Sequence, residues 1–118
     1  MNNNNGQQTA ETFRQESLDK ITREFSPDNC TITFEDDAEE EYKYVLTDLP
    51  ALDQNLLKEH NLIAKWTFVV ADQTTVIKPV ISKETIAQSS PAELQNYIKN
   101  KIIEQAVATL VSQKYPVH

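Results

Sequence analysis

The chain has 118 residues, of which 39% are hydrophobic and 25% are charged, and its formal net charge is −7. This length and hydrophobic content predict one folded domain, and the single cysteine, Cys30, excludes an internal disulfide and a zinc site built from several cysteines. The only glycine is Gly6, so residues 7–118 lack the glycine-dependent loops that bind dinucleotides, phosphates or calcium.

The negative charge is concentrated in one segment of the sequence. Residues 28–53 contain nine acidic residues and one lysine, a net charge of −8, whereas the rest of the chain has nine acids and ten bases. Such a surface repels nucleic acid and anionic lipid, so we expect no nucleic-acid partner and no membrane partner. The sequence shows no apolar run of about 18 residues and no signal-peptide pattern, which predicts a soluble cytoplasmic protein.

Residues 1–8 are rich in asparagine and glutamine and have nothing to bury, so we expect this segment to be disordered. Residues 9–118 are expected to form a single domain. Thr9 is a candidate N-cap for a helix over residues 10–25, and the Ser-Pro-Asp-Asn sequence at 26–29 predicts a break after it. Four side chains are expected to form the buried stripe of this helix: Phe13, Leu18, Ile21 and Phe25.

In residues 30–34 and in residues 42–46, every second side chain is apolar or aromatic, which predicts the two strands of a β-hairpin. Cys30 lies on the apolar side of the first strand, so we interpret it as a core residue and not as a reactive thiol. The long connection between the strands is expected to form an acidic surface at the hairpin tip: Glu35, Asp36, Asp37, Glu39, Glu40 and Glu41.

A second hairpin is predicted further along the chain. Residues 48–60 contain Pro50 and three leucines, and we expect a short helix there. Residues 61–72 alternate most clearly and predict a strand, which a turn at 71–74 connects to a further strand over 75–81. Pro79 has no backbone N–H to donate, so this last segment is expected to be an edge strand, or Pro79 to mark the end of the strand.

The last predicted helix has the clearest start in the chain. Ser90, Pro91 and Glu93 match a capping box with proline at the first helical position, and the helix is expected to end near Lys114, before Pro116. Its second half is apolar on two sides and therefore needs cover on both. The N-terminal helix could provide that cover, or the following residues could form an interface with another chain: Ile103, Val107, Leu110 and Val111.

Together these elements predict an α+β fold. We expect a four-stranded antiparallel sheet of two hairpins, with the N-terminal helix, a short middle helix and the long C-terminal helix packed on it.

No group of residues indicates catalysis, a cofactor or a metal. The acidic tip lacks the glycine and the ligand spacing of a calcium loop. His60 and His118 are the only histidines and have no cluster of further ligand-type residues around them in the sequence. A surface for stacking bases could include Trp66, Phe68, Tyr42 and Tyr44, but it needs a positive groove, and Tyr42 and Tyr44 lie beside the acidic tip. We therefore interpret these aromatic residues as core.

Three hypotheses about function follow. The first is a small non-enzymatic protein-interaction or assembly module, a homodimer or other homo-oligomer that associates through the C-terminal helix or a sheet edge. The alternative is an acidic inhibitor or antitoxin-like protein that binds a basic partner through residues 28–53. The third is a small-ligand pocket between the sheet and the helices.

Overall fold

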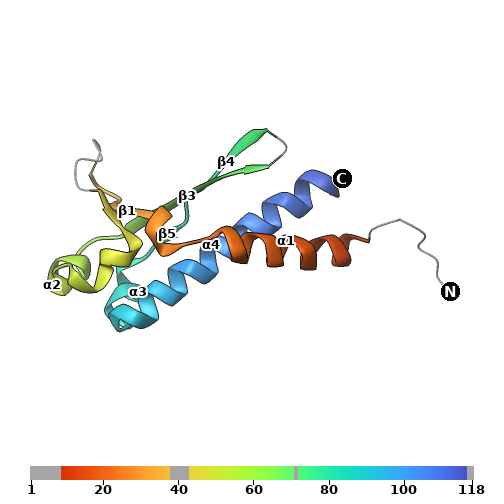
Figure 1. Cartoon of the computed structure of the whole chain (residues 1–118). Coiled ribbons are helices and arrows are strands. Elements are labelled where there is room, and N and C mark those ends of the chain that lie inside the picture. Colours follow the sequence, from red (N-terminus) through yellow and green to blue (C-terminus); the bar gives the residue numbers. More distant parts are fainter. Residues whose placement is uncertain (1–8, 38–42, 71, 117–118) are drawn as a thin grey trace.

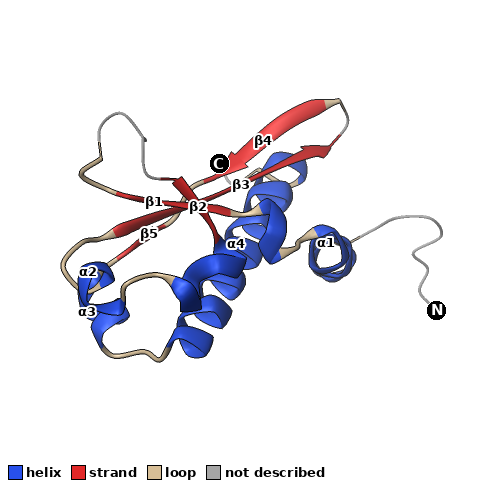
Figure 2. Cartoon of the chain, turned by 60° about the vertical axis from the view of Figure 1, so that its left-hand side comes forward, coloured by secondary structure: helices blue, strands red, loops and turns tan. Residues whose placement is uncertain are grey.

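The computed structural model describes residues 9–37, 43–70 and 72–116 of the chain. These residues form an α+β fold in which two long helices, α1 (Ala10–Glu24) and α4 (Pro91–Lys114), pack on an antiparallel sheet (Figure 1). In the turned view of Figure 2, both helices again lie on one side of the strands. The predicted fold class is therefore confirmed. The segment expected to be disordered, residues 1–8, lies outside the described residues.

Helix α1 begins at the predicted cap, because the Thr9 side chain accepts a hydrogen bond from the backbone N–H of Thr12. The helix packs against α4, and Ser17 and Ile21 are its buried residues. The prediction that Leu18 belongs to the buried stripe is wrong, since this side chain is 38% exposed. The stripe follows a spacing of four residues, so the small Ser17 occupies the position between Phe13 and Ile21 and Leu18 faces solvent.

The sheet has five strands where four were predicted. Their bounds are Thr31–Phe34 (β1), Lys43–Val45 (β2), Leu62–Val70 (β3), Gln73–Ile77 (β4) and Val80–Ile81 (β5). The order across the sheet is β2-β1-β3-β4, and β5 also pairs with β3. Both β4 and β5 are antiparallel to β3 and keep a single register along it. The fifth strand is therefore the end of the predicted edge strand, which is interrupted at Pro79 because proline has no backbone N–H.

The connections between strands contain short helical segments. They are η1 (Pro27–Asn29), η2 (Leu46–Ala51), α2 (Gln54–Leu57) and α3 (Lys83–Ala87). The single short helix expected over residues 48–60 is divided into η2 and α2, because Asp53 caps a new helix with its side chain. Helix α3 was not predicted; the Ser82 side chain caps it by accepting from the backbone N–H of Thr85.

Helix α4 starts at the predicted capping box. The backbone N–H of Glu93 donates to the Ser90 hydroxyl, and the backbone N–H of Ser90 donates to the Glu93 carboxylate at 2.8 Å. Hydrogen bonding of the Glu93 carboxylate to the Ser90 backbone, and to a lesser extent to the Ser90 side chain, holds the pKa of Glu93 below its usual value, since it favours the ionised form. The helix ends at Lys114, as the sequence predicts.

The core lies between the sheet and the two long helices. The inward side of β3 contributes Leu62, Ala64, Trp66 and Phe68, which are all buried. The Trp66 ring contacts Phe25 edge-on at 5.5 Å between centroids and stacks on Phe68 at 4.9 Å. Cys30 is also fully buried, which confirms its interpretation as a core residue.

Candidate interaction surfaces

The second apolar face of α4 is covered within the chain. Ile103, Val107 and Leu110 are buried, and Val111 is partly buried against the same core. Helix α1 provides the cover: it packs on α4, and the rings of Phe13 and Tyr115 meet edge-on at 5.8 Å. Of the two interpretations of this face, cover by the N-terminal helix is therefore the one that the fold contains.

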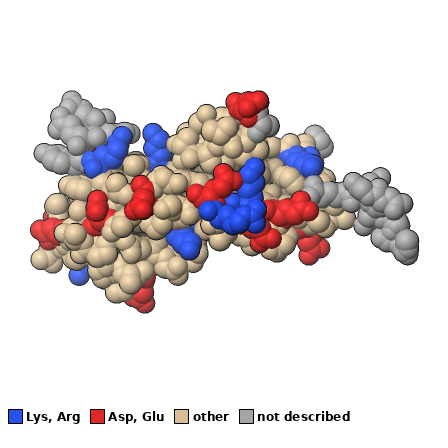
Figure 3. All heavy atoms as spheres, in the orientation of Figure 1, with Lys and Arg blue, Asp and Glu red and all other residues tan. Residues whose placement is uncertain are grey.

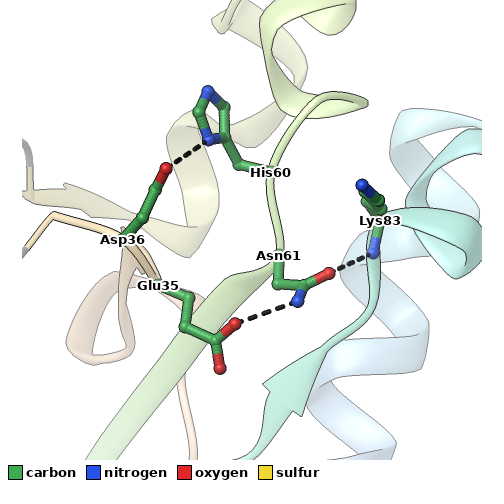
Figure 4. Close-up of polar contacts among 5 residues, drawn as sticks. All are labelled: Glu35, Asp36, His60, Asn61 and Lys83. Atoms are coloured by element: carbon green, nitrogen blue, oxygen red, sulfur yellow. Dashed lines mark hydrogen bonds and ion pairs between the residues drawn. The ribbon is translucent and has the colours of Figure 1, made fainter.

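The described acidic residues of the hairpin tip lie where β1 ends. Glu35 and Asp36 are exposed, and Asp37 is half-buried. The carboxylate of Asp36 lies 3.1 Å from Nδ1 of His60, while Glu35 accepts a hydrogen bond of 2.9 Å from the Asn61 side chain (Figure 4). The other predicted members of the acidic surface, Glu39, Glu40 and Glu41, lie outside the described residues.

Asn61 ties three segments together, a role that sequence reasoning missed. Its amide nitrogen donates to Glu35 at the end of β1, and its carbonyl oxygen accepts a 2.8 Å hydrogen bond from the backbone N–H of Lys83, the first residue of α3 (Figure 4). An asparagine before a strand is common, so only the three-dimensional arrangement shows the role. The result is a fixed junction beside the acidic residues.

An open pocket of about 440 Å³ lies on the other side of His60. The Phe34 ring lies 6.2 Å from the ring of Tyr44 and 4.9 Å from that of His60. The six lining residues are Phe34, Asp36, Asp37, Tyr44, Leu56 and His60. Aromatic faces beside carboxylates are suited to a cationic side chain. We call this site the aromatic–acidic pocket.

The described residues offer little for nucleophilic or metal chemistry. Burial raises the pKa of the Cys30 thiol to about 12, which keeps the sulfur protonated and unreactive at neutral pH. Within the described ranges, no three histidine, cysteine or acidic side chains come together as metal ligands. Nor does any described helix combine the length and apolar character needed to cross a bilayer.

The free edge of the sheet at β4 is the second candidate surface. Strand β4 pairs with β3 on one side and has no partner strand among the described residues on the other. Its five residues, Gln73 to Ile77, are uncharged. Asp72 directly precedes them in the chain and Lys78 directly follows them. Val76 is 46% exposed on the sheet face away from the helices. An exposed, uncharged edge of this kind can pair with a further strand.

Acidic and basic side chains are interspersed along the face that Figure 3 shows, which includes the side chains of α1. The excess negative charge of residues 28–53 therefore does not make this whole face acidic.

Comparison of the chain with protein-family models, curated proteins and solved structures found no match. The fold and the two surfaces are consequently the basis for a functional proposal.

Proposed function

We propose that this protein is a small non-enzymatic interaction module of the cytoplasm that associates with a second copy through the free edge of β4. The observation that carries this proposal is an edge strand that has no partner strand on its outer side in the described part of the chain, with no charged residue between Asp72 and Lys78. Sheet proteins that stay monomeric usually block such an edge with a charge, a bulge or a covering segment.

The sheet edge is the better of the two interfaces that the sequence suggests. The predicted face on α4 is already buried against α1, so its exposure would cost the free energy of that packing. Pairing at β4 leaves the core intact. It also gives a strand partner to backbone groups that have none among the described residues, and it extends the hydrogen-bonding pattern of the existing sheet.

Sedimentation velocity over a concentration range tests the proposal with two matched variants. Val76 on β4 and Val69 on β3 are both exposed on the same sheet face, by 46% and 57%, but only Val76 lies on the edge. Val76→Lys places a charge at the contact and is expected to weaken association at least about tenfold, whereas Val69→Lys leaves it unchanged. A wild-type protein that remains monomeric at all concentrations would refute the proposal.

A second candidate function is binding of a basic partner, as an inhibitor or antitoxin-like protein would bind one. The aromatic–acidic pocket favours it, because Phe34 and Tyr44 can pack on a cationic side chain that Asp36 pairs with. The guanidinium group of arginine fits this combination best, since it is planar and stacks on aromatic rings.

A short arginine-containing peptide, and the same peptide with neutral citrulline in place of arginine, test this second candidate by NMR titration. Asp36→Asn is expected to weaken binding of the arginine peptide about fivefold. Glu104→Gln removes the same charge from the remote α4 and serves as the matched control. Equal binding of the two peptides, or an equal effect of the two variants, would exclude the pocket as the site.

A further inference from the structure

We infer that two copies join β4 to β4 in antiparallel orientation about a two-fold axis at Thr75, with Asp72 of each copy opposite Lys78 of the partner subunit. The inference rests on the proposed function, because it requires self-association, and it adds the register and the recognition chemistry. Four observations carry it: the free backbone groups, the centre of the edge, the exposed side chains and the charges at its ends.

The free backbone groups of β4 follow from its pairing with β3. The backbone N–H of Ala64 donates to the carbonyl of Pro79, so this pair is hydrogen-bonded. Hydrogen-bonded pairs recur at every second residue of an antiparallel ladder, which makes Phe68–Thr75 and Trp66–Ile77 hydrogen-bonded pairs as well. The backbone groups of the alternate residues, Thr74 and Val76, therefore point to the open edge.

The pattern of free groups restricts the register. With a two-fold axis at Thr75, Thr74 lies opposite Val76 of the partner subunit, and both residues present free backbone groups to each other. Thr75 then lies opposite its own copy as a non-hydrogen-bonded pair. All five residues of β4 are paired in this register, so it uses the whole edge between Asp72 and Lys78.

The side chains also complement one another in this register. Thr74 and Val76 share the sheet face away from the helices, and each would meet the other across the new interface. Cross-strand pairs of β-branched residues stabilise antiparallel sheets. The exposed Val69 lies on β3, one strand in from the edge, so it stays outside this contact.

Charge complementarity identifies a second copy as the occupant. Counting outward from Thr75, Asp72 and Lys78 are equally distant, so the two-fold axis places opposite charges together at both ends of the interface. Thr74 and Val76 alternate within β4 and share a sheet face, whereas Asp72 and Lys78 adjoin the two ends of the strand, with Asp72 in the turn before it. The edge carries a carboxylate at one end and an ammonium at the other, which is self-complementary in the antiparallel arrangement.

A cysteine cross-link tests the register directly. Thr75→Cys places two thiols opposite each other in a non-hydrogen-bonded pair, where Cα atoms are about 4.5 Å apart and a disulfide fits. The native Cys30 is fully buried and does not compete. Gln73→Cys is the control, because the inferred register separates its two copies by roughly 13 Å. Rapid, concentration-dependent oxidation of the Thr75→Cys variant alone is the expected result.

Charge reversal provides the second test. Lys78→Glu faces Asp72 of the partner subunit with a like charge at both ends and is expected to weaken association at least about tenfold. The double variant Asp72→Lys, Lys78→Glu restores opposite charges and should recover most of this loss. Lys65→Glu makes the same charge change on the central strand β3 and should have little effect. A thermal melt of each variant confirms that it is folded.

The outcomes separate the inference from the proposed function. If the wild-type protein associates but Thr75→Cys fails to cross-link and the double reversal fails to rescue, the register is wrong while self-association stands. If Val76→Lys has no effect either, the sheet edge is excluded. A protein that stays monomeric overturns both.

Discussion

The buried thiol of Cys30 is expected to make the stability of the protein depend on pH. Burial raises the pKa of its thiol from 9.0 to about 12, so the folded state holds the proton more tightly than the unfolded state does. Below the pKa of the thiol in the unfolded chain, the thiol therefore does not make the free energy of unfolding depend on pH. As the pH rises from that pKa towards the pKa in the folded protein, the free energy of unfolding decreases.

The free energy of unfolding is expected to fall by about 1 kcal/mol more in the wild type than in Cys30→Ala between about pH 8 and about pH 10. Chemical denaturation of the two proteins at each pH measures the difference, and the comparison cancels the titration of the lysines and tyrosines. Parallel pH profiles for the two proteins would mean that the thiol is accessible to water in the folded state.

Asp72 occupies a backbone conformation that most residues avoid. Its φ angle is 66°, in the left-handed region, at the turn between β3 and β4. Asparagine and aspartate tolerate this region better than alanine does. We expect Asp72→Ala to lower the free energy of unfolding by about 1 kcal/mol, and Asp72→Asn to leave it nearly unchanged. Urea denaturation at low protein concentration measures the folding effect apart from association; equal stability of both variants would contradict it.

At the scale of elements, the contact between α1 and α4 decides how the C-terminal helix is covered. Ile21 is fully buried in this contact, whereas the neighbouring Leu18 is 38% exposed. Ile21→Ala is expected to cost about 3 kcal/mol of unfolding free energy, and Leu18→Ala less than about 1 kcal/mol. Thermal or urea unfolding measures both. A larger cost at Leu18 would show that α1 packs with a different face.

Elements with strong local signals could be predicted from the sequence. Helix α4 was predicted from Ser90 to Lys114 because its capping box and its proline act within one turn. The separation of the last predicted strand into β4 and β5 could be predicted only in part. Pro79 indicates an edge strand, but β5 continues the register of β4 because both strands pair with β3. Helix α3 has five residues, too few for an apolar period to be visible.

The candidate surfaces were harder to predict because distant residues build them. Phe34 and Tyr44 come from neighbouring strands, while Leu56 and His60 come from the connection that precedes β3. No local pattern brings these residues together. The burial of Ser17 in place of Leu18 was also not predicted from the sequence. A small polar residue fits where two helices approach closely, but the hydrophobic pattern favours the larger apolar neighbour.

At the scale of the whole molecule, the two candidate surfaces involve different parts of the sheet. The aromatic–acidic pocket is formed around the ends of β1 and β2. The free edge belongs to β4, which pairs with β3 on the side away from β1 (Figure 1). A dimer joined at β4 would leave one pocket on each copy, on the outer side of β3. Self-association and binding of a basic partner are therefore compatible, and we expect Val76→Lys to retain arginine-peptide binding in the same NMR titration.

We propose above all that the free edge of β4 pairs with a second copy. Amide hydrogen exchange, resolved residue by residue and measured from about 5 µM to about 500 µM protein, tests it most directly. Pairing at β4 predicts that the backbone amides of Thr74 and Val76 become protected in step with dimer formation, while Thr75, already bonded to β3, changes little. Association without any added protection of Thr74 and Val76, or with protection confined to α4, would contradict it.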